Sequence, residues 1–137
     1  MLTVKSKPPG QRQTTQREAI EKVIRAAKGP LTIDQILARA RRSSRGLGVA
    51  TVYRNVKLLL ESQEIRAVTL PDGQTRYEAG DLGHHHHFRC RRCDRVFDMA
   101  GCHVSIPDGT RLSGGFLVED HELTLFGLCP ECVKGAK

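Results

Sequence analysis

Hydrophobic residues recur at helical spacing in the first half of the chain. Ile20, Val23, Ile24 and Ala27 follow one another at i, i+3, i+4 and i+7, which places them on one face of an α-helix. We therefore predict an amphipathic helix over residues 15–27. Residues 1–13 are mostly polar and contain prolines and a glycine, so we expect them to form a mobile basic arm.

Two further helices are predicted before residue 64. Thr32 can cap a helix that runs to about Arg42, because the side chain of Gln35, three residues on, can reach back to its N–H. A third helix is predicted over residues 49–63. Its apolar positions at helical spacing are Val52, Val56, Leu59 and Leu60. Three short helices in close succession are typical of a helix-turn-helix.

A β-hairpin is predicted directly after the third helix. Residues 65–70 and 74–79 are rich in β-forming side chains, and Pro71, Asp72 and Gly73 between them form a typical turn. A hairpin after a recognition helix is the wing of a winged helix. The alternative interpretation is an unrelated small α+β domain with the same element order.

The composition changes at His84, where His, Cys and short apolar runs begin. We expect strands in residues 84–90, 95–100, 115–121 and 122–129, with residues 107–115 as the main loop region. The predicted fold class is therefore α+β. It consists of an N-terminal winged helix-turn-helix, residues 1–79, and a small C-terminal α/β domain with a structural metal, residues 80–137.

Charge separates the two halves in the same way. Residues 1–80 contain 15 Lys or Arg and 7 Asp or Glu, whereas residues 81–137 contain 7 and 8. A basic excess confined to one lobe indicates contact with a polyanion such as nucleic acid, although a solvated basic surface would give the same count. The chain has no apolar run of membrane-spanning length and no signal peptide at its N-terminus, so we expect a cytoplasmic protein.

Four of the five cysteines form two Cys-x-x-Cys pairs. Cys90 and Cys93 make the first pair, Cys129 and Cys132 the second, and 35 residues lie between them. A tight turn of this spacing directs two thiolates at one tetrahedral zinc ion, and four thiolates leave no open position, so we predict structural zinc. Two redox-active dithiols are the alternative, but they would require a thioredoxin-like context that the sequence lacks. Cys102 is interpreted as a buried residue or as a further ligand.

Four consecutive histidines precede the first cysteine pair. If this segment is extended, His85 and His87 project to one side of the strand and His84 and His86 to the other. One run can then serve two metal sites. Carboxylates could complete either site, and the candidates are Glu78 and Asp98 for the first pair, with His121 and Glu119 for the second. Each of these carboxylates could instead be an ordinary surface charge.

Taken together, these features make the chain resemble the ferric uptake regulator superfamily. The residues that carry the resemblance are Thr14 to Arg17, Ala50 to Asn55, Arg76 to Glu78, the histidine run before Cys90 and Cys93, Asp98, and Gly127 to Cys132. They span nearly the whole chain in order.

The resemblance implies a homodimer that binds a palindromic DNA operator when a sensing site is loaded, usually repressing metal-uptake or stress genes. It assigns the sensory site to Glu78, His85, His87 and Asp98, and a possible second site in a C-terminal dimerisation domain to His84, His86 and His121. The DNA-contacting residues that it leads us to expect are Arg12, Arg17, Thr51, Tyr53 and Arg54. The regulatory ion would be Fe(II), Mn(II) or Zn(II). A ligand set of two imidazoles and two carboxylates suits all three ions and therefore does not identify the sensed one.

The sequence departs from the family pattern at several positions. Pro30 stands where a further sensory histidine is usual, and Ser105 stands near the position of the second site's glutamate. Gln63 replaces a common helix-ending glycine, a modest cost if a left-handed conformation is needed there. The segment after Asp98 is short and contains Pro107, so we expect the helix of the dimerisation domain to be truncated.

Two classes of function fit these features. The first is a metal-dependent transcriptional repressor without enzymatic activity, which controls metal homeostasis or the response to peroxide. The second is a metalloenzyme or metal-buffering protein that uses the cluster of histidines and carboxylates. The basic N-terminal lobe favours the first, because the second has no need of it.

Overall fold

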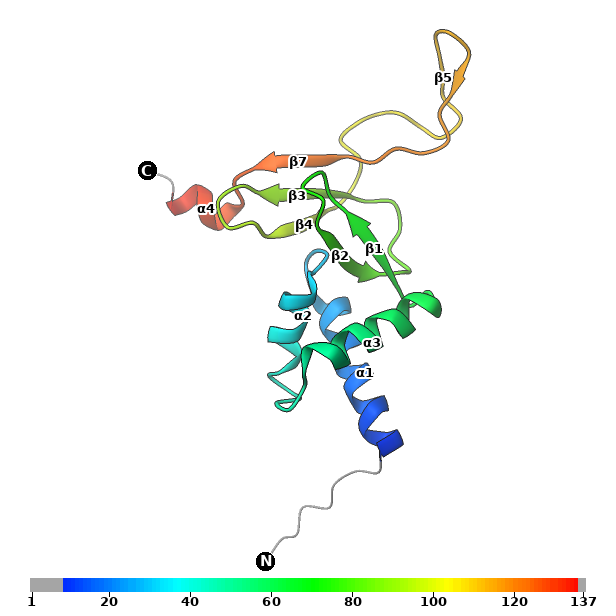
Figure 1. The fold of residues 1–137 in the computed structure, drawn as a ribbon. Coiled ribbons are helices and arrows are strands. Elements are labelled where there is room, and N and C mark those ends of the chain that lie inside the picture. The colour runs from blue at the N-terminus through cyan, green and yellow to red at the C-terminus, as the bar shows by residue number, and fades with distance from the viewer. Residues whose placement is uncertain (1–8, 136–137) are drawn as a thin grey trace, which may run out of the picture. The chain divides into compact units, whose positions relative to one another are not determined.

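The computed structural model describes residues 9–135, and the chain divides into two compact units, one ending at Asp81 and one beginning at Leu82. The first unit contains three helices and a hairpin (Figure 1). Its elements are α1 (Pro9–Ala26), α2 (Ile33–Ala40), α3 (Val49–Glu61), β1 (Ile65–Thr69) and β2 (Thr75–Ala79). Among the described residues, no helix is both long enough and apolar enough to cross a membrane.

The apolar faces of the three helices form the core of the first unit. The predicted stripe of α1 contributes Ile20 and Ile24, α2 contributes Ile36, and α3 contributes Val52 and Leu59; all five are buried. Burying an aliphatic side chain of this size stabilises the fold by about 1.5–3 kcal/mol. This packing fixes the side of α3 that faces the core, and the opposite side is exposed.

The helix ends differ in part from those predicted. α1 begins at Pro9, so the prediction of a mobile arm is wrong for residues 9–13, while residues 1–8 lie outside the described part of the chain. A proline is compatible with the first turn of a helix, because the N–H that it lacks would have no intrahelical partner there. The capping box of α2 is confirmed, since Gln35 N donates to Thr32 Oγ1 at 3.2 Å and Thr32 N donates to Gln35 Oε1 at 3.0 Å.

The wing is also confirmed. β1 and β2 pair antiparallel with Arg66 opposite Glu78, and Gly73 occupies the turn with a φ of 81°. α3 ends at Glu61, two residues earlier than predicted, because Gln63 is left-handed with a φ of 62°. Gln63 therefore adopts the left-handed conformation in which a glycine would be less strained.

The second unit contains a three-stranded sheet in the order β4-β3-β7, in which β3 pairs antiparallel with β4 and parallel with β7. Its elements are β3 (His86–Cys90), β4 (Val96–Met99), β5 (Arg111–Leu112), β6 (Phe116–Leu117), β7 (Thr124–Gly127) and α4 (Pro130–Gly135). The strand predicted over residues 115–121 is reduced to β6, which pairs with β5 inside the region expected to be a loop. No helix is present between Asp98 and Gly115, and the short α4 was not predicted.

Candidate metal centres

The four paired cysteines converge at one end of the β4-β3-β7 sheet. Cys90 is the last residue of β3, and Cys129 follows β7. The four sulfur atoms of Cys90, Cys93, Cys129 and Cys132 lie within 4.8 Å of one another, and the Sγ atoms of Cys93 and Cys129 are 3.9 Å apart. A tetrahedral zinc ion with Zn–S bonds of about 2.3 Å requires sulfur–sulfur distances of about 3.8 Å. The donor set therefore fits a closed, structural zinc site.

The turn between Cys90 and Cys93 prepares these sulfurs for a cation. Asp94 is left-handed with a φ of 61°, which turns the chain so that Asp94 N donates to Cys90 O at 2.9 Å. The N–H of Cys93 donates to Cys90 Sγ at 3.5 Å, and backbone donors of this kind lower the pKa of Cys90 to about 6. Burial, together with the neighbouring thiols, raises the pKa of Cys132 to about 12.

An arginine connects the two cysteine pairs. Arg95 Nε donates to Cys93 Sγ at 3.3 Å, and its Nη2 donates to Glu131 Oε2 at 2.6 Å. Its guanidinium lowers the pKa of Cys93 and thereby favours the thiolate that zinc binds. Arg95 belongs to no motif that can be identified from residue spacing alone.

The histidine run alternates as predicted, although only His86 and His87 lie within β3. The rings of His85 and His87 are neighbours, with centroids 4.8 Å apart, and both approach Asp98 on β4. The Nε2 atoms of His85 and His87 lie 3.6 and 3.5 Å from Asp98 Oδ1, and His87 is directly opposite Asp98 in the strand register. His85 Nδ1 must donate to Gly83 O at 2.7 Å, because a carbonyl only accepts, so in the neutral ring Nε2 is the nitrogen that carries the lone pair.

Glu78, the fourth predicted sensory ligand, belongs to the first unit. It lies on β2 with a buried side chain, and Arg66 Nη2 forms an ion pair with its Oε2 at 2.7 Å. Pro30, which replaces the usual histidine, is buried in the same unit. The three donors His85, His87 and Asp98 lie together in the second unit, and the part played by Glu78 stays a prediction.

The other two histidines of the run form a different cluster with His121. His84 lies 4.6 Å from His86 and 4.7 Å from His121 between ring centroids. Cys102 belongs to this cluster, since its Sγ is 3.2 Å from His86 Nε2 and 3.3 Å from His121 Nε2. Glu119 is exposed and is not among the groups that gather there.

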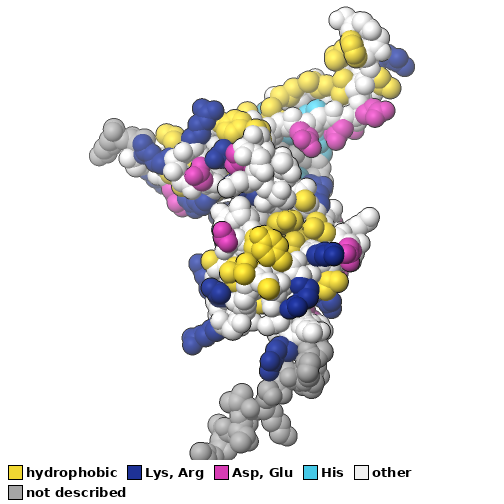
Figure 2. All heavy atoms as spheres, viewed as in Figure 1, with side chains coloured by type: hydrophobic (Ala, Val, Ile, Leu, Met, Phe, Trp, Pro, Cys, Tyr) yellow, Lys and Arg dark blue, Asp and Glu magenta, His cyan; other side chains and the backbone are white. Residues whose placement is uncertain are grey.

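The residues expected to contact DNA are distributed over α1 and α3. Tyr53 and Arg54 are exposed on α3, Tyr53 with 58% of its surface accessible, and Arg54 Nη2 donates to Thr51 Oγ1 at 3.2 Å. Arg12 is exposed and lines a hollow with Ser44 and Gly46 of the loop before α3, whereas Arg17 is half-buried. Lys and Arg side chains are scattered over the surface of the helical unit in Figure 2.

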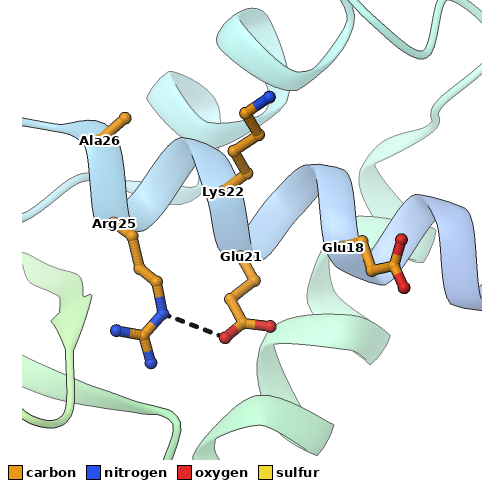
Figure 3. A pocket seen from close by; sticks show the side chains of 5 residues that line it. All are labelled: Glu18, Glu21, Lys22, Arg25 and Ala26. Carbon is orange, nitrogen blue, oxygen red and sulfur yellow. Dashed lines mark hydrogen bonds and ion pairs between the residues drawn. The ribbon is translucent and has the colours of Figure 1, made fainter.

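A second hollow on α1 is lined by Glu18, Glu21, Lys22, Arg25 and Ala26 (Figure 3). Two of its charges are paired, because Arg25 Nε donates to Glu21 Oε1 at 3.1 Å. Arg25 also forms an ion pair with Asp81 at 3.0 Å and thereby lowers the pKa of that carboxyl. This hollow lies along one helix, and none of its residues belongs to the clusters that could hold a metal ion.

Comparison with known proteins agrees with this architecture. The model of the ferric uptake regulator family matches residues 9–126. The chain is 29% identical over 131 residues to the peroxide operon regulator of Bacillus subtilis, covering 93% of this chain and 88% of that protein. It is also 29% identical over 124 residues to the ferric uptake regulation protein of the same organism, covering 87% and 83%.

Among solved structures, the ferric uptake regulator of Francisella tularensis with iron superposes with a TM-score of 0.65 at 24% identity, covering 94% of this chain and 99% of that one. That likeness establishes the fold. The family match, which extends from α1 into β7, establishes the relationship. The chain belongs to the ferric uptake regulator family and is a metal-responsive, DNA-binding transcriptional regulator.

Proposed function

We propose that the protein is a homodimeric, cytoplasmic repressor whose affinity for a palindromic operator is set by a divalent ion bound at His85, His87 and Asp98. The observation that supports this most directly is the meeting of those three donors in the second unit, without a thiolate. Two imidazoles and one carboxylate leave coordination positions open, unlike the closed set of four cysteines. Such a site can gain and lose its ion while the structural zinc stays in place.

The fourth ligand in this proposal is Glu78. It is assigned from the resemblance of the sequence to the family, in which ligands from both domains hold the sensed ion. An ion held in this way would restrict the angle between the two DNA-binding units of a dimer, and thereby match them to half-sites about one or more helical turns apart. Because Arg66 forms an ion pair with Glu78, loading the site would require Glu78 to share its charge between Arg66 and the ion.

The exposed face of α3 is the proposed recognition surface. Tyr53 and Arg54 would read base edges in the major groove, while Arg12 and Arg17 of α1 and the hydroxyl of Thr51 would contact phosphates. In the second unit, a set of large apolar residues lies exposed and would be covered in a dimer. They are Leu112, Phe116, Leu117, Phe126, Leu128 and Val133.

A second metal site is proposed at His84, His86 and His121. A protein that only stores metal would also use these clusters, but it would not need a winged helix with a basic surface. The proposed genes are those of metal uptake or of the response to peroxide, as the names of the two Bacillus subtilis relatives suggest for those proteins.

The test is DNA binding by purified protein that retains its structural zinc and has been stripped of other metals. An operator is first selected from random DNA with the metal-loaded protein, and fluorescence anisotropy then measures its affinity during titration with Fe(II), Mn(II) or Zn(II). We expect at least one ion to raise the affinity tenfold or more, and Asp98→Ala to abolish that effect. Glu119→Ala removes an exposed carboxylate outside the clusters and serves as the control. Metal binding without any change in DNA affinity would favour the storage protein.

A further inference from the structure

Cys102 and two histidines form a nearly equilateral triangle of potential ligand atoms. Cys102 Sγ is 3.2 Å from His86 Nε2 and 3.3 Å from His121 Nε2, and the two nitrogen atoms are 3.3 Å apart. His84 offers a fourth atom within 4.8 Å of these three. The chain segments that supply them are separated by up to 37 residues, so the cluster does not arise from local sequence.

The distances in this triangle approach the edges of a zinc coordination tetrahedron. With Zn–N bonds of about 2.05 Å and Zn–S bonds of about 2.3 Å, the nitrogen–nitrogen edge is about 3.3 Å and the nitrogen–sulfur edge about 3.6 Å. The distance between His86 and His121 equals the first value, and the two distances to Cys102 are a few tenths of an ångström below the second. Movement of one exposed cysteine would correct that difference.

We propose that Cys102 is the fourth ligand of the second metal site, which is then a three-histidine, one-thiolate site for Zn(II). This inference rests on the second site proposed above and assigns it a complete donor set and a metal. Ser105, near which the family pattern would supply a glutamate, is exposed and lines the hollow beside the cluster without joining it. A soft sulfur donor thus takes the place of a hard oxygen donor in the ligand set.

The protonation states of the cluster suit this role. His86 is buried, and its Nε2 atom is the one that faces Cys102 Sγ and His121 Nε2. The thiol of Cys102 donates its proton to Val104 O at 2.7 Å. When a divalent ion binds, that S–H bond breaks, the sulfur–metal bond forms, and one proton leaves to solvent. The redox states of metal and sulfur do not change.

The cluster is open on one side. His84, Cys102 and His121 line a hollow, together with Ser105 and Asp108 from the following loop. An ion can enter from this side and the thiol proton can leave by it. Asp108 also lines the hollow, but its carboxylate does not belong to the metal-binding group of His84, His86, Cys102 and His121.

The donor set predicts selectivity for zinc at this site. Imidazole and thiolate donors suit Zn(II), whereas Mn(II) favours carboxylate, carbonyl and water oxygens. The sensory donors His85, His87 and Asp98 include a carboxylate and no sulfur. The two faces of the histidine run would therefore differ in the metals that they retain, with zinc on the side of Cys102.

The test uses Co(II) as a spectroscopic probe on full-length protein that keeps its structural zinc, with zinc content checked after each titration. A thiolate that binds Co(II) produces a charge-transfer band in the near ultraviolet, which imidazoles and carboxylates do not. We expect this band in the unmodified protein and its loss in Cys102→Ser. Zinc affinity of the same site, measured by chelator competition, should fall at least tenfold in Cys102→Ser, since losing a ligand costs more than losing its supporting partner.

Two controls separate the possible outcomes. His103→Ala, which changes the exposed neighbour of Cys102, and Asp108→Asn, which neutralises the carboxylate of the hollow, should both leave the band unchanged. If Co(II) bands in the visible region respond to His86→Ala but no thiolate band forms, the site exists and Cys102 is not its ligand. If His86→Ala changes neither spectrum nor zinc affinity, the second site itself is wrong. Loss of the band in Asp108→Asn with retention in Cys102→Ser would also overturn the assignment.

Discussion

Arg95 and Glu131 form a hydrogen-bonded ion pair of 2.6 Å that joins the two Cys-x-x-Cys turns. The same guanidinium donates to Cys93 Sγ at 3.3 Å and lies over the ring of Phe97, 5.4 Å from its centroid. Arg95 therefore contacts a zinc thiolate and fixes the residue between the other two cysteines.

We expect Arg95→Lys to lower the zinc affinity of the cysteine site about tenfold to a hundredfold, the range typical of groups that support a ligand. A lysine has a single terminal nitrogen and lacks the planar guanidinium, whose separate Nε and Nη2 atoms donate to Cys93 and to Glu131. Chelator competition at fixed pH measures the effect. Arg92→Lys, at an exposed position of the same turn, is the matched control, and equal affinities for both variants would contradict the role of Arg95.

Removal of a cysteine ligand should have a larger effect. Cys90→Ser removes a buried thiolate at the end of the central strand β3, and binding energy at a structural zinc is also folding energy. We expect loss of zinc, loss of the cooperative thermal transition of the second unit, and loss of dimers in sedimentation. A variant that keeps its melting temperature and its oligomeric state would disprove a structural role for this site.

The alternation of the histidine run predicts different effects for adjacent, chemically identical residues. His85→Ala and His87→Ala should abolish the metal dependence of DNA binding, because their imidazoles face Asp98. His84→Ala and His86→Ala should leave that dependence in place and reduce zinc binding beside Cys102. The measurement is operator affinity with and without the activating ion. Equal losses in all four variants would mean that the two clusters do not act separately.

On α3, Tyr53→Ala and Arg54→Ala should weaken operator binding by about 1–3 kcal/mol each if these side chains contact bases. Both residues are exposed and lie outside the metal clusters, so metal content and thermal stability should not change. Binding by the unmodified protein should also decrease steeply with salt. Unchanged operator affinity in both variants would show that this face of α3 does not contact the operator.

The end of α3 offers a test of stability. Gln63 is left-handed with a φ of 62°, a conformation that costs a residue with a Cβ about 1–2 kcal/mol. Gln63→Gly should raise the free energy of unfolding by up to about 1 kcal/mol. Relief of the left-handed strain stabilises the fold, but the greater backbone entropy that glycine loses on folding offsets part of that stabilisation. Urea denaturation of the zinc-loaded protein measures it.

Gly80→Ala should act in the opposite direction. Its added Cβ would collide with the backbone carbonyl of Gln63, and Gly80 N donates to Glu64 O at 2.9 Å, so the two segments cannot separate freely. We expect a loss of at least 1 kcal/mol. Gly46→Ala, where a Cβ would meet no neighbour within 4 Å, is the control, and equal stabilities would show that the close approach is not required.

Regular, locally encoded elements of this fold were predictable from sequence. The stripe from Ile20 to Ala27, the capping box at Thr32 and the turn at Gly73 each depend on side chains a few residues apart. The start of α1 was not predictable in this way, since the sequence of its first turn contains no apolar stripe that would mark it. α4 is a single short helix that includes Cys132, and its six residues are too few to show a period.

The metal clusters illustrate the same limit. The cysteine pairs and the alternation of the histidines follow from spacing along one turn or one strand. Cys102 lies 16 residues from His86 and 19 from His121, in a segment without regular structure. Its position is set by the path of the irregular chain between β4 and β5, which no periodic pattern encodes.

β3 supplies a ligand candidate to every one of the three clusters: His86 to one, His87 to another and Cys90 to the third. The strand is only five residues long, or roughly 17 Å. The three sites therefore share one short piece of backbone. In thermodynamic terms, the three ions would be linked ligands. If an ion at one site changes the affinity of a second site, then an ion at the second site changes the affinity of the first by the same factor. The affinity measured for the sensed ion would then depend on how much zinc the other two sites hold.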